Sequence, residues 1–314
     1  MTKYAYYPGC SGLGTSQEYD SSTRAVCRAL GVELVDIPDW SCCGSTPAHT
    51  VDHLLSSALA ARNLALAEHL DATALITPCP SCLTNLKVAV HRMSDREFRL
   101  QVNKLLDKPV DRSTPVKSVL QVLAEDVGPD AVAEMLPNKP LAGLKLAPYY
   151  GCIMNRPPEV MQFDDHENPM AMDKLMAALG AEVLPFPLKV ECCGASYGVA
   201  RKDIVAKLSG KLLEAAEDLG AHAVVTACPL CQMNLDLRQG QAGASAGRKF
   251  QMPVFYYTQL LGLALGVPQS KLGLSKLCVN PRLALDAMHA AQAEQREREA
   301  KSEADKQTLK AKAA

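Results

Sequence analysis

The segment ATALITPCPSCLTNL, residues 72–86, indicates how this chain folds. It begins as a short run of β-forming residues, reaches the motif Cys-Pro-x-Cys at Cys79 and Cys82, and then changes to a helical pattern. Pro80 suits the first turn of a helix, because the backbone N–H that proline lacks is not needed there. The segment therefore predicts a strand that ends at two cysteines and leads directly into a helix.

The other half of the chain repeats this pattern as HAVVTACPLCQMNL, residues 222–235. The remaining motifs also occur twice in the same order: a β-like run ending in Gly-Cys (residues 3–10 and 145–152) and a Cys-Cys-Gly (residues 40–44 and 190–194). The offset between the copies is 142 residues at the first cysteine and 149 at the last. The chain is therefore an internal duplication, and ten of its 12 cysteines belong to the repeated motifs.

The segments between the cysteines alternate between β-like and helical patterns. The helical segments in the two halves are residues 16–31 and 167–180, then 51–70 and 203–219, and the second β-like runs are residues 32–38 and 181–187. A last pair of similar segments begins at Pro115 and Pro253. Strands that alternate with helices of this length predict βαβ units. We therefore expect an α/β fold of two pseudo-symmetric domains, each with a small parallel sheet flanked by helices.

The domain boundary is expected near residues 137–143, where two prolines and a glycine interrupt the pattern. This gives a first domain at residues 1–142 and a second at residues 143–288. The sequence from residue 289 to 314 is rich in Ala, Glu, Gln, Lys and Arg and has no apolar stripe. We expect it to be a charged C-terminal tail that is helical or disordered.

Composition excludes several classes of protein. The 314 residues carry 33 Lys+Arg against 34 Asp+Glu, and this balance argues against a nucleic-acid binder. An apolar fraction of 48% is too high for a disordered chain. The apolar run at residues 260–267 is far shorter than the ~18–20 residues of a membrane helix, and the N-terminus lacks the pattern of a signal peptide. These features predict a cytoplasmic protein, where thiols stay reduced and disulfides are rare.

Three kinds of thiol site remain for the two sets of five cysteines. The carboxyl ends of parallel strands meet at one edge of a sheet, so each set should converge there. A structural zinc ion needs only four ligands. A thioredoxin-like dithiol would use Cys79 and Cys82 but none of the other three cysteines. An iron–sulfur cluster takes several thiolates from separate loops and accommodates the count best.

The doubled pattern resembles a known family. A cysteine, then 31 or 39 residues, a Cys-Cys-Gly, then 35 or 34 residues, and a Cys-x-x-Cys is the cysteine-rich CCG motif. Up to about residue 288 the chain resembles the B-type subunit of heterodisulfide reductase. Related domains occur in thiol:fumarate reductases and in the iron–sulfur subunits of glycolate and lactate oxidation systems.

The resemblance implies that each motif binds one noncubane [4Fe-4S] cluster through all five of its cysteines. The first set is Cys10, Cys42, Cys43, Cys79 and Cys82, and the second set is Cys152, Cys192, Cys193, Cys228 and Cys231. Neither set lacks a member. The resemblance further implies that the two clusters face each other across the domain interface.

The activity implied by the resemblance is cleavage or formation of a disulfide, or oxidation of carrier-bound sulfur. Electrons would come from a ferredoxin-like (C-type) and a flavin-containing (A-type) subunit of the same complex, because this chain has no nucleotide-binding fingerprint of its own. The substrate would be a thiol or disulfide, with no role for nucleic acid or a membrane. The alternative is an electron-relay iron–sulfur subunit of a lactate- or glycolate-type dehydrogenase.

Residues outside the ten cysteines carry weaker expectations. Cys27 and Cys278 are expected to pack as small apolar groups. His166 is the candidate proton donor near the substrate. Gly44 and Gly194, which follow the Cys-Cys pairs, are expected to permit a backbone turn or a close approach to the cluster. The tyrosine pairs before Cys10 and Cys152 are interpreted as strand-forming residues rather than as proton donors.

Overall fold

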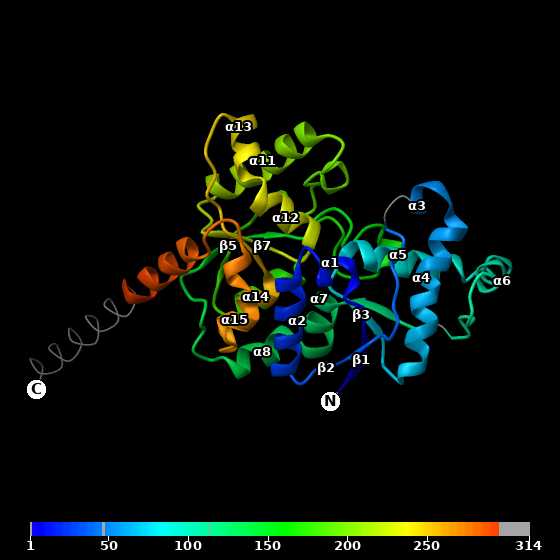
Figure 1. Ribbon diagram of the computed structural model, residues 1–314. Helices are drawn as coiled ribbons and strands as arrows, with labels where there is room; N and C mark the ends of the chain where they lie inside the picture. The colour runs from blue at the N-terminus through cyan, green and yellow to red at the C-terminus, as the bar shows by residue number, and fades with distance from the viewer. Residues whose placement is uncertain (1, 46–47, 113, 295–314) are drawn as a thin grey trace, which may run out of the picture.

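The computed structural model describes residues 2–45, 48–112 and 114–294. Its strands form two separate parallel sheets of four strands each (Figure 1). The strands are β1 (Lys3–Tyr6), β2 (Glu33–Asp36), β3 (Leu75–Thr77) and β4 (Val116–Ser118), then β5 (Lys145–Tyr149), β6 (Glu182–Val183), β7 (Ala223–Thr226) and β8 (Val254–Tyr256). Their orders are β2-β1-β3-β4 and β6-β5-β7-β8. The identical orders confirm the predicted pair of α/β units.

Helices connect the strands and cover both sheets. Those of the first half are α1 (Gly9–Leu13), α2 (Gln17–Ala29), α3 (Ala48–Val51), α4 (His53–Ala67), η1 (Glu68–Leu70), α5 (Pro80–Arg92), α6 (Arg96–Asn103), α7 (Val119–Gln121), η2 (Val122–Val127) and α8 (Pro129–Met135). Those of the second half are α9 (Pro158–Met161), α10 (Ala171–Ala178), η3 (Ala195–Tyr197), α11 (Lys202–Asp218), α12 (Pro229–Leu237), α13 (Gln239–Ala246), α14 (Tyr257–Ala264), α15 (Gln269–Leu272) and η4 (Leu274–Lys276).

The strand register brings the carboxyl ends of the strands to one rim in each half. In the first sheet Tyr6 pairs with both Asp36 and Ile76. In the second sheet Thr226 pairs with both Tyr149 and Tyr256. Every loop that leaves a carboxyl end therefore begins at the same edge of its sheet, where functional sites of open α/β sheets form.

One strand is much shorter than expected. The segment 181–187 predicted a run like that of residues 32–38, but β6 contains only Glu182 and Val183. Pro185 and Pro187 follow at once, and proline cannot donate a ladder hydrogen bond. The chain therefore leaves the second sheet earlier than it leaves the first.

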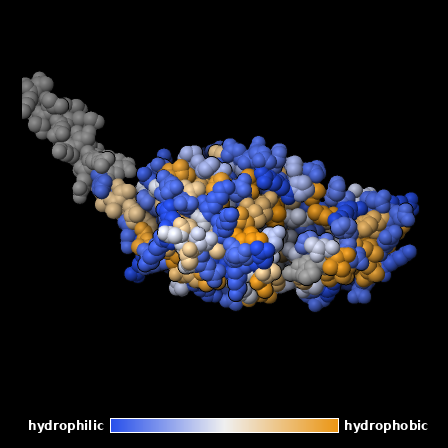
Figure 2. Space-filling view, turned by 90° about the horizontal axis from the view of Figure 1, so that it is seen from above, coloured by the Kyte–Doolittle hydropathy of each residue, from blue (hydrophilic) through white to orange (hydrophobic). Residues whose placement is uncertain are grey.

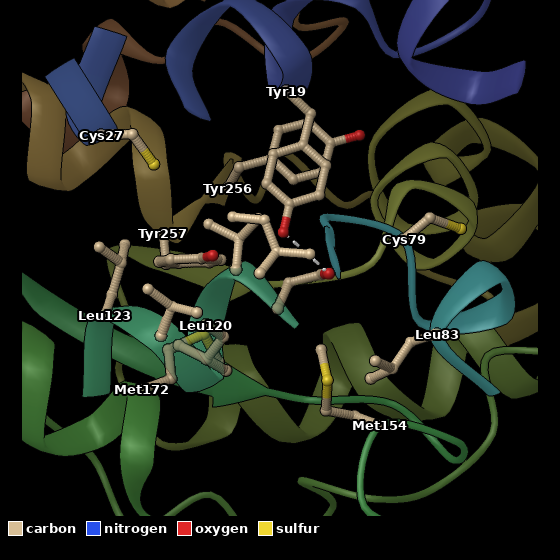
Figure 3. Packing of buried hydrophobic residues seen from close by; sticks show 14 of the residues in the cluster. Tyr19, Cys27, Cys79, Leu83, Leu120, Leu123, Met154, Met172, Tyr256 and Tyr257 are labelled. Carbon is tan, nitrogen blue, oxygen red and sulfur yellow. Dashed lines mark hydrogen bonds between the residues drawn. The ribbon is translucent and has the colours of Figure 1, made fainter. Parts of the chain in front are cut away.

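The helix after the last strand of each half packs against the first long helix of the other half. Helix α14 lies against α2, and α7 and η2 lie against α10. Tyr19 of α2 stacks on Tyr256 with ring centroids 4.0 Å apart and planes 4° apart (Figure 3). Ser22 and Thr258 are hydrogen-bonded at 2.7 Å beside this pair. The two halves thus share one apolar core, in which each half completes the packing of the other.

The C-terminal end of the described chain contacts the segment between the two halves. Residues 282–294 are helical, and the side-chain N–H of Gln292 donates to the carbonyls of Pro140 and Ala142 at 3.1 and 3.0 Å. Of the expected tail, residues 295–314 lie outside the described residues. The domain limits at residues 142 and 288 stay a prediction.

The surface seen from above carries polar and apolar side chains side by side (Figure 2). In the part of the chain that the structure describes, no helix has the length and apolar character required to cross a membrane.

Candidate functional site

The three cysteine motifs of each half lie where strands end. Cys10 is in α1, directly after β1, and Cys42 and Cys43 follow β2. Cys79 follows β3 and precedes Pro80, the first residue of α5. The second half has the same arrangement around β5, β6 and β7. The rim predicted from the sequence is therefore present in both halves.

Within each rim the second cysteine of the Cys-Cys pair lies beside the last cysteine of the set. The sulfurs of Cys43 and Cys82 are 3.4 Å apart, and those of Cys193 and Cys231 are 3.6 Å apart. These cysteines are separated by 39 and 38 residues in sequence. The fold therefore joins two loops of each motif at nearly the same sulfur–sulfur distance.

Burial divides each set of five in the same way. Three thiols are buried: Cys43, Cys79 and Cys82 in the first half, and Cys193, Cys228 and Cys231 in the second. The other two lie toward the outside, with Cys10, Cys42 and Cys192 exposed and Cys152 partly exposed. Each set therefore has an inner side shielded from water and an outer side open to solvent.

A glycine before the first cysteine makes room for the last one. A Cβ added at Gly9 would stand 2.9 Å from the sulfur of Cys82, and one added at Gly151 would stand 3.0 Å from the sulfur of Cys231. Both glycines have positive φ, +68° and +79°. Only glycine gives the backbone both this conformation and this close approach to sulfur.

A buried tyrosine holds the Cys-Cys loop in each half. The hydroxyl of Tyr7 donates to the carbonyl of Ser41 at 2.7 Å, and that of Tyr149 donates to the carbonyl of Glu191 at 2.8 Å. Ser41 and Glu191 both directly precede a Cys-Cys pair. The tyrosines are therefore more than strand-forming residues, because they fix the position of the second motif.

An asparagine reaches a cysteine sulfur in each half. The side-chain N–H of Asn85 points to Cys43 Sγ at 3.9 Å, and that of Asn234 points to Cys193 Sγ at 3.6 Å. Sequence reasoning missed this pair, although an asparagine follows three residues after the last cysteine in both copies. The repeated position was the available signal.

The close sulfurs change each other's ionisation. Sharing a proton with Cys82 lowers the pKa of Cys43 to about 6, and the backbone of Ser45 and the amide of Asn85 act in the same direction. Sharing a proton with Cys231 likewise lowers the pKa of Cys193. A lower pKa favours the thiolate, which is the form of cysteine that binds metals.

Two contacts connect the halves beside the rims. The hydroxyl of Thr84, two residues after Cys82, donates to the carbonyl of Pro80 at 2.9 Å, and its oxygen also lies 3.4 Å from the carbonyl of Ile153, the residue after Cys152. Tyr19 of the first half donates to the carbonyl of Ala227, the residue before Cys228, at 3.0 Å. Both contacts therefore reach the second cysteine set, at the residues next to Cys152 and Cys228.

The donor set fits a polynuclear cluster better than a single ion. A structural zinc site gathers four donors around one centre. Five soft sulfurs from three loops, three of them shielded from water, suit the thiolate ligation of an iron–sulfur cluster.

The structure also places the weaker candidates. Cys27 is fully buried in the core, as expected. Cys278 is exposed, so the expectation that it packs inside is wrong, because its segment is held at the surface through a backbone N–H bond to Asp236 at 2.7 Å. His166 is in an exposed loop, where its carbonyl accepts from Arg156.

Gly44 and Gly194 have φ of +79° and +82°, which agrees with the expected turns.

A methyl group at Gly9 should prevent the first site from binding metal. The added Cβ of Gly9→Ala would meet the sulfur of Cys82, so we expect the variant to be purified with about half of the iron of the parent protein. Gly31→Ala is the matched control, because Gly31 has a similar φ of +73° but no atom within 4 Å of the added Cβ. The control should lose only ~1–2 kcal/mol of stability. Equal iron contents would show that the sulfur contact is unimportant.

Comparison with known proteins agrees with this geometry. The model of the CCG cysteine-rich domain matches the chain twice, at residues 4–87 and 146–236. The 8-methylmenaquinol:fumarate reductase membrane anchor subunit of Wolinella succinogenes is 38% identical over 87% of this chain and 95% of its own length. The B-type subunit of the ferredoxin:CoB-CoM heterodisulfide reductase of Methanosarcina mazei is 30% identical over 89% and 94%.

Two further similarities extend the comparison. A protein of Archaeoglobus profundus that is named as similar to the B-type subunit of heterodisulfide reductase is 32% identical over 90% of this chain and 96% of its own length. A solved structure of a hypothetical protein from Helicobacter pylori has a TM-score of 0.70 at 14% identity and covers 89% of this chain and 52% of that one, which supports the fold alone. With the CCG domain present twice and relatives of this similarity along most of its length, the chain belongs to the iron–sulfur protein family of the heterodisulfide reductase B-type subunit.

Proposed function

We propose that the ten motif cysteines bind two noncubane [4Fe-4S] clusters, one in each half, and that the chain is the catalytic subunit of a heterodisulfide reductase-like complex. The observation that carries this proposal is that both rims present a complete five-thiol set with the same division into inner and outer sulfurs. When bound, such clusters supply one-electron steps and iron sites with affinity for sulfur.

The residues of the chain have distinct roles in this proposal. The three inner thiols of each set hold a cluster away from water, and the outer thiols leave one side open for a substrate. Tyr7 and Tyr149 keep the Cys-Cys loops in place through their hydroxyl groups. The hydrogen bond of Tyr19 and the contact of Thr84 with Ile153 tie the first half to the second cysteine set, which would let both sites act on one molecule.

The proposed reaction is the reduction of a disulfide to two thiols, or its reverse. Cleavage of the S–S bond consumes two electrons and two protons, and each half would deliver one electron. The electrons would come from partner subunits of the complex, for which we propose the ferredoxin-like and flavin-containing subunits of the family. His166 remains a proposed proton source.

A second candidate is an electron-relay subunit of an organic-acid reductase or dehydrogenase. The observation that favours it is the 38% identity with a subunit of a fumarate reductase, which exceeds the 29–32% identity with the B-type relatives of heterodisulfide reductase. In this role both clusters would pass electrons on, and no disulfide would bind.

Metal analysis and a substrate assay test these functions. Protein purified without oxygen should contain about eight irons per chain, four from each cluster. Its complex should oxidise a reduced viologen dye when a mixed disulfide of two small thiols is added. Zinc in place of iron would exclude the cluster assignment. Iron without disulfide-dependent oxidation, together with oxidation of a reduced quinone analogue in the presence of fumarate, would select the relay role.

A further inference from the structure

Asn85 and Asn234 occupy equivalent places in the two halves, and each directs a side-chain N–H at the second sulfur of a Cys-Cys pair. Asn85 lies on α5 and Asn234 on α12, one turn after the last cysteine of its motif. Their nitrogens are 3.9 Å from Cys43 Sγ and 3.6 Å from Cys193 Sγ. The contact of Asn234 has the usual length for an N–H donor to sulfur, and that of Asn85 is at the long end.

The sulfurs that receive these bonds are in the water-shielded part of each site. Cys43 and Cys193 are 3% and 2% exposed. A hydrogen bond is electrostatically stronger in such surroundings than in water. Water does not reach these sulfurs freely, so the amides, together with the backbone N–H groups of Ser45 and Ala195, supply positive charge density beside them.

A donor at a ligand sulfur affects the two oxidation states of a cluster differently. Reduction adds an electron and increases the negative charge on the sulfurs. An N–H donor therefore stabilises the reduced state more than the oxidised state and raises the reduction potential. Removing the donor should lower the potential.

We propose that Asn85 and Asn234 set the reduction potentials of the two clusters through these N–H···S bonds. The inference rests on the proposed function, because it takes Cys43 and Cys193 as cluster ligands. It goes further by assigning a role to two side chains that are not ligands.

The two asparagines are not equal, and this predicts a difference between the sites. Asn234 is fully buried, is closer to its sulfur and also donates to the carbonyl of Cys193 at 3.3 Å. Asn85 is only partly buried and makes the longer contact. The second cluster should therefore depend more strongly on its asparagine than the first.

The test measures each potential in a chain that holds only one cluster. Asn234→Leu is made in a Cys43→Ala chain, and Asn85→Leu in a Cys193→Ala chain, since leucine has as many side-chain heavy atoms as asparagine but no donor. Iron content and an EPR-monitored redox titration are recorded for each. At the second cluster we expect a tenfold shift toward the oxidised form at fixed potential, which for one electron is about 59 mV. At the first cluster the shift should have the same sign and be smaller.

Ser209→Ala is the matched control for the second site. Its hydroxyl donates to the carbonyl of Cys193 at 3.2 Å but not to the sulfur. This variant should keep its iron and its potential, which separates the effect on the sulfur from support of the loop. Asn234→Asp is the second variant, because it keeps the shape of the side chain and loses the donor.

The outcomes separate this inference from the function on which it rests. Full iron in Cys43→Ala and Cys193→Ala chains would remove the ligand assignment and the inference with it. If those chains keep half of the iron but the reduction potential is unchanged in both asparagine variants, the tuning role alone would be overturned. Loss of iron from both Asn234→Leu and Asn234→Asp would also overturn it, because the asparagine would then serve to retain the cluster.

Discussion

Replacing Cys193 with alanine should remove about half of the iron from the purified protein, about four of eight ions per chain. Cys193 is buried, lies 3.6 Å from Cys231 and receives the amide of Asn234, so its loss removes one of the three inner thiols of the second set. The first set of cysteines lies on its own sheet and should be unaffected. Iron analysis with EPR spectra of the reduced protein measures the loss and identifies the remaining cluster.

Three variants control this experiment. Cys43→Ala should give the reciprocal result, with the second cluster intact. Cys27→Ala and Cys278→Ala remove a buried and an exposed cysteine outside the motifs, so both should retain all of the iron. Complete loss of iron from Cys193→Ala would contradict two independent sites, and no loss would remove Cys193 from the ligands.

Replacing Tyr19 with alanine should lower the free energy of unfolding by ~3–5 kcal/mol, the range for deletion of a large aromatic side chain from a core. Tyr19 is 2% exposed, stacks on Tyr256 and lies edge-on to Tyr257 with ring centroids 6.2 Å apart. It is also the residue of α2 that bonds the carbonyl before Cys228. Denaturant unfolding followed by circular dichroism measures the change.

Two substitutions separate packing from hydrogen bonding. Tyr19→Phe keeps the stack and removes the hydroxyl, so it should cost only ~1 kcal/mol. Tyr197→Ala deletes a tyrosine that is 47% exposed and should change stability by less than ~0.5 kcal/mol. A loss below ~1 kcal/mol for Tyr19→Ala would mean that the contact between the halves relaxes when the ring is removed.

The sequence predicted the cysteine rims well because their signals are local. Each motif couples a β-like run to a cysteine and a turn residue, and the duplication allowed one copy to be checked against the other. The short β6 was harder to foresee, since Pro185 and Pro187 belong to a run whose composition is otherwise β-like. Both asparagines are visible in the repeated sequence motifs. The amino-acid sequence does not show, however, that their amides reach a cysteine sulfur 42 and 41 residues away.

The contact between the halves could not be predicted from sequence pattern. Tyr19 and Tyr256 are more than 200 residues apart in the sequence, yet their rings stack. The hydrophobic periodicity of a helix does not show which other helix it packs against. An amphipathic stripe on α2 shows that one face is buried but not that α14 of the other half covers it. The exposure of Cys278 depends in the same way on a distant partner, the carboxylate of Asp236.

The reciprocal packing of α14 on α2 and of α7 and η2 on α10 has a consequence for ancestry. Contacts in which each unit offers the same patch to the other are isologous, the kind that closes a symmetric dimer. Two identical copies of one unit would pair in this way, so the present arrangement is the one that fusion of a symmetric dimer would produce. In a fused chain the two copies no longer need to have the same sequence. One contact is aromatic, with Tyr19 and Tyr256, whereas Leu123 of η2 and Met172 of α10 are aliphatic (Figure 3). The two cysteine sites of the fused chain can therefore acquire different properties.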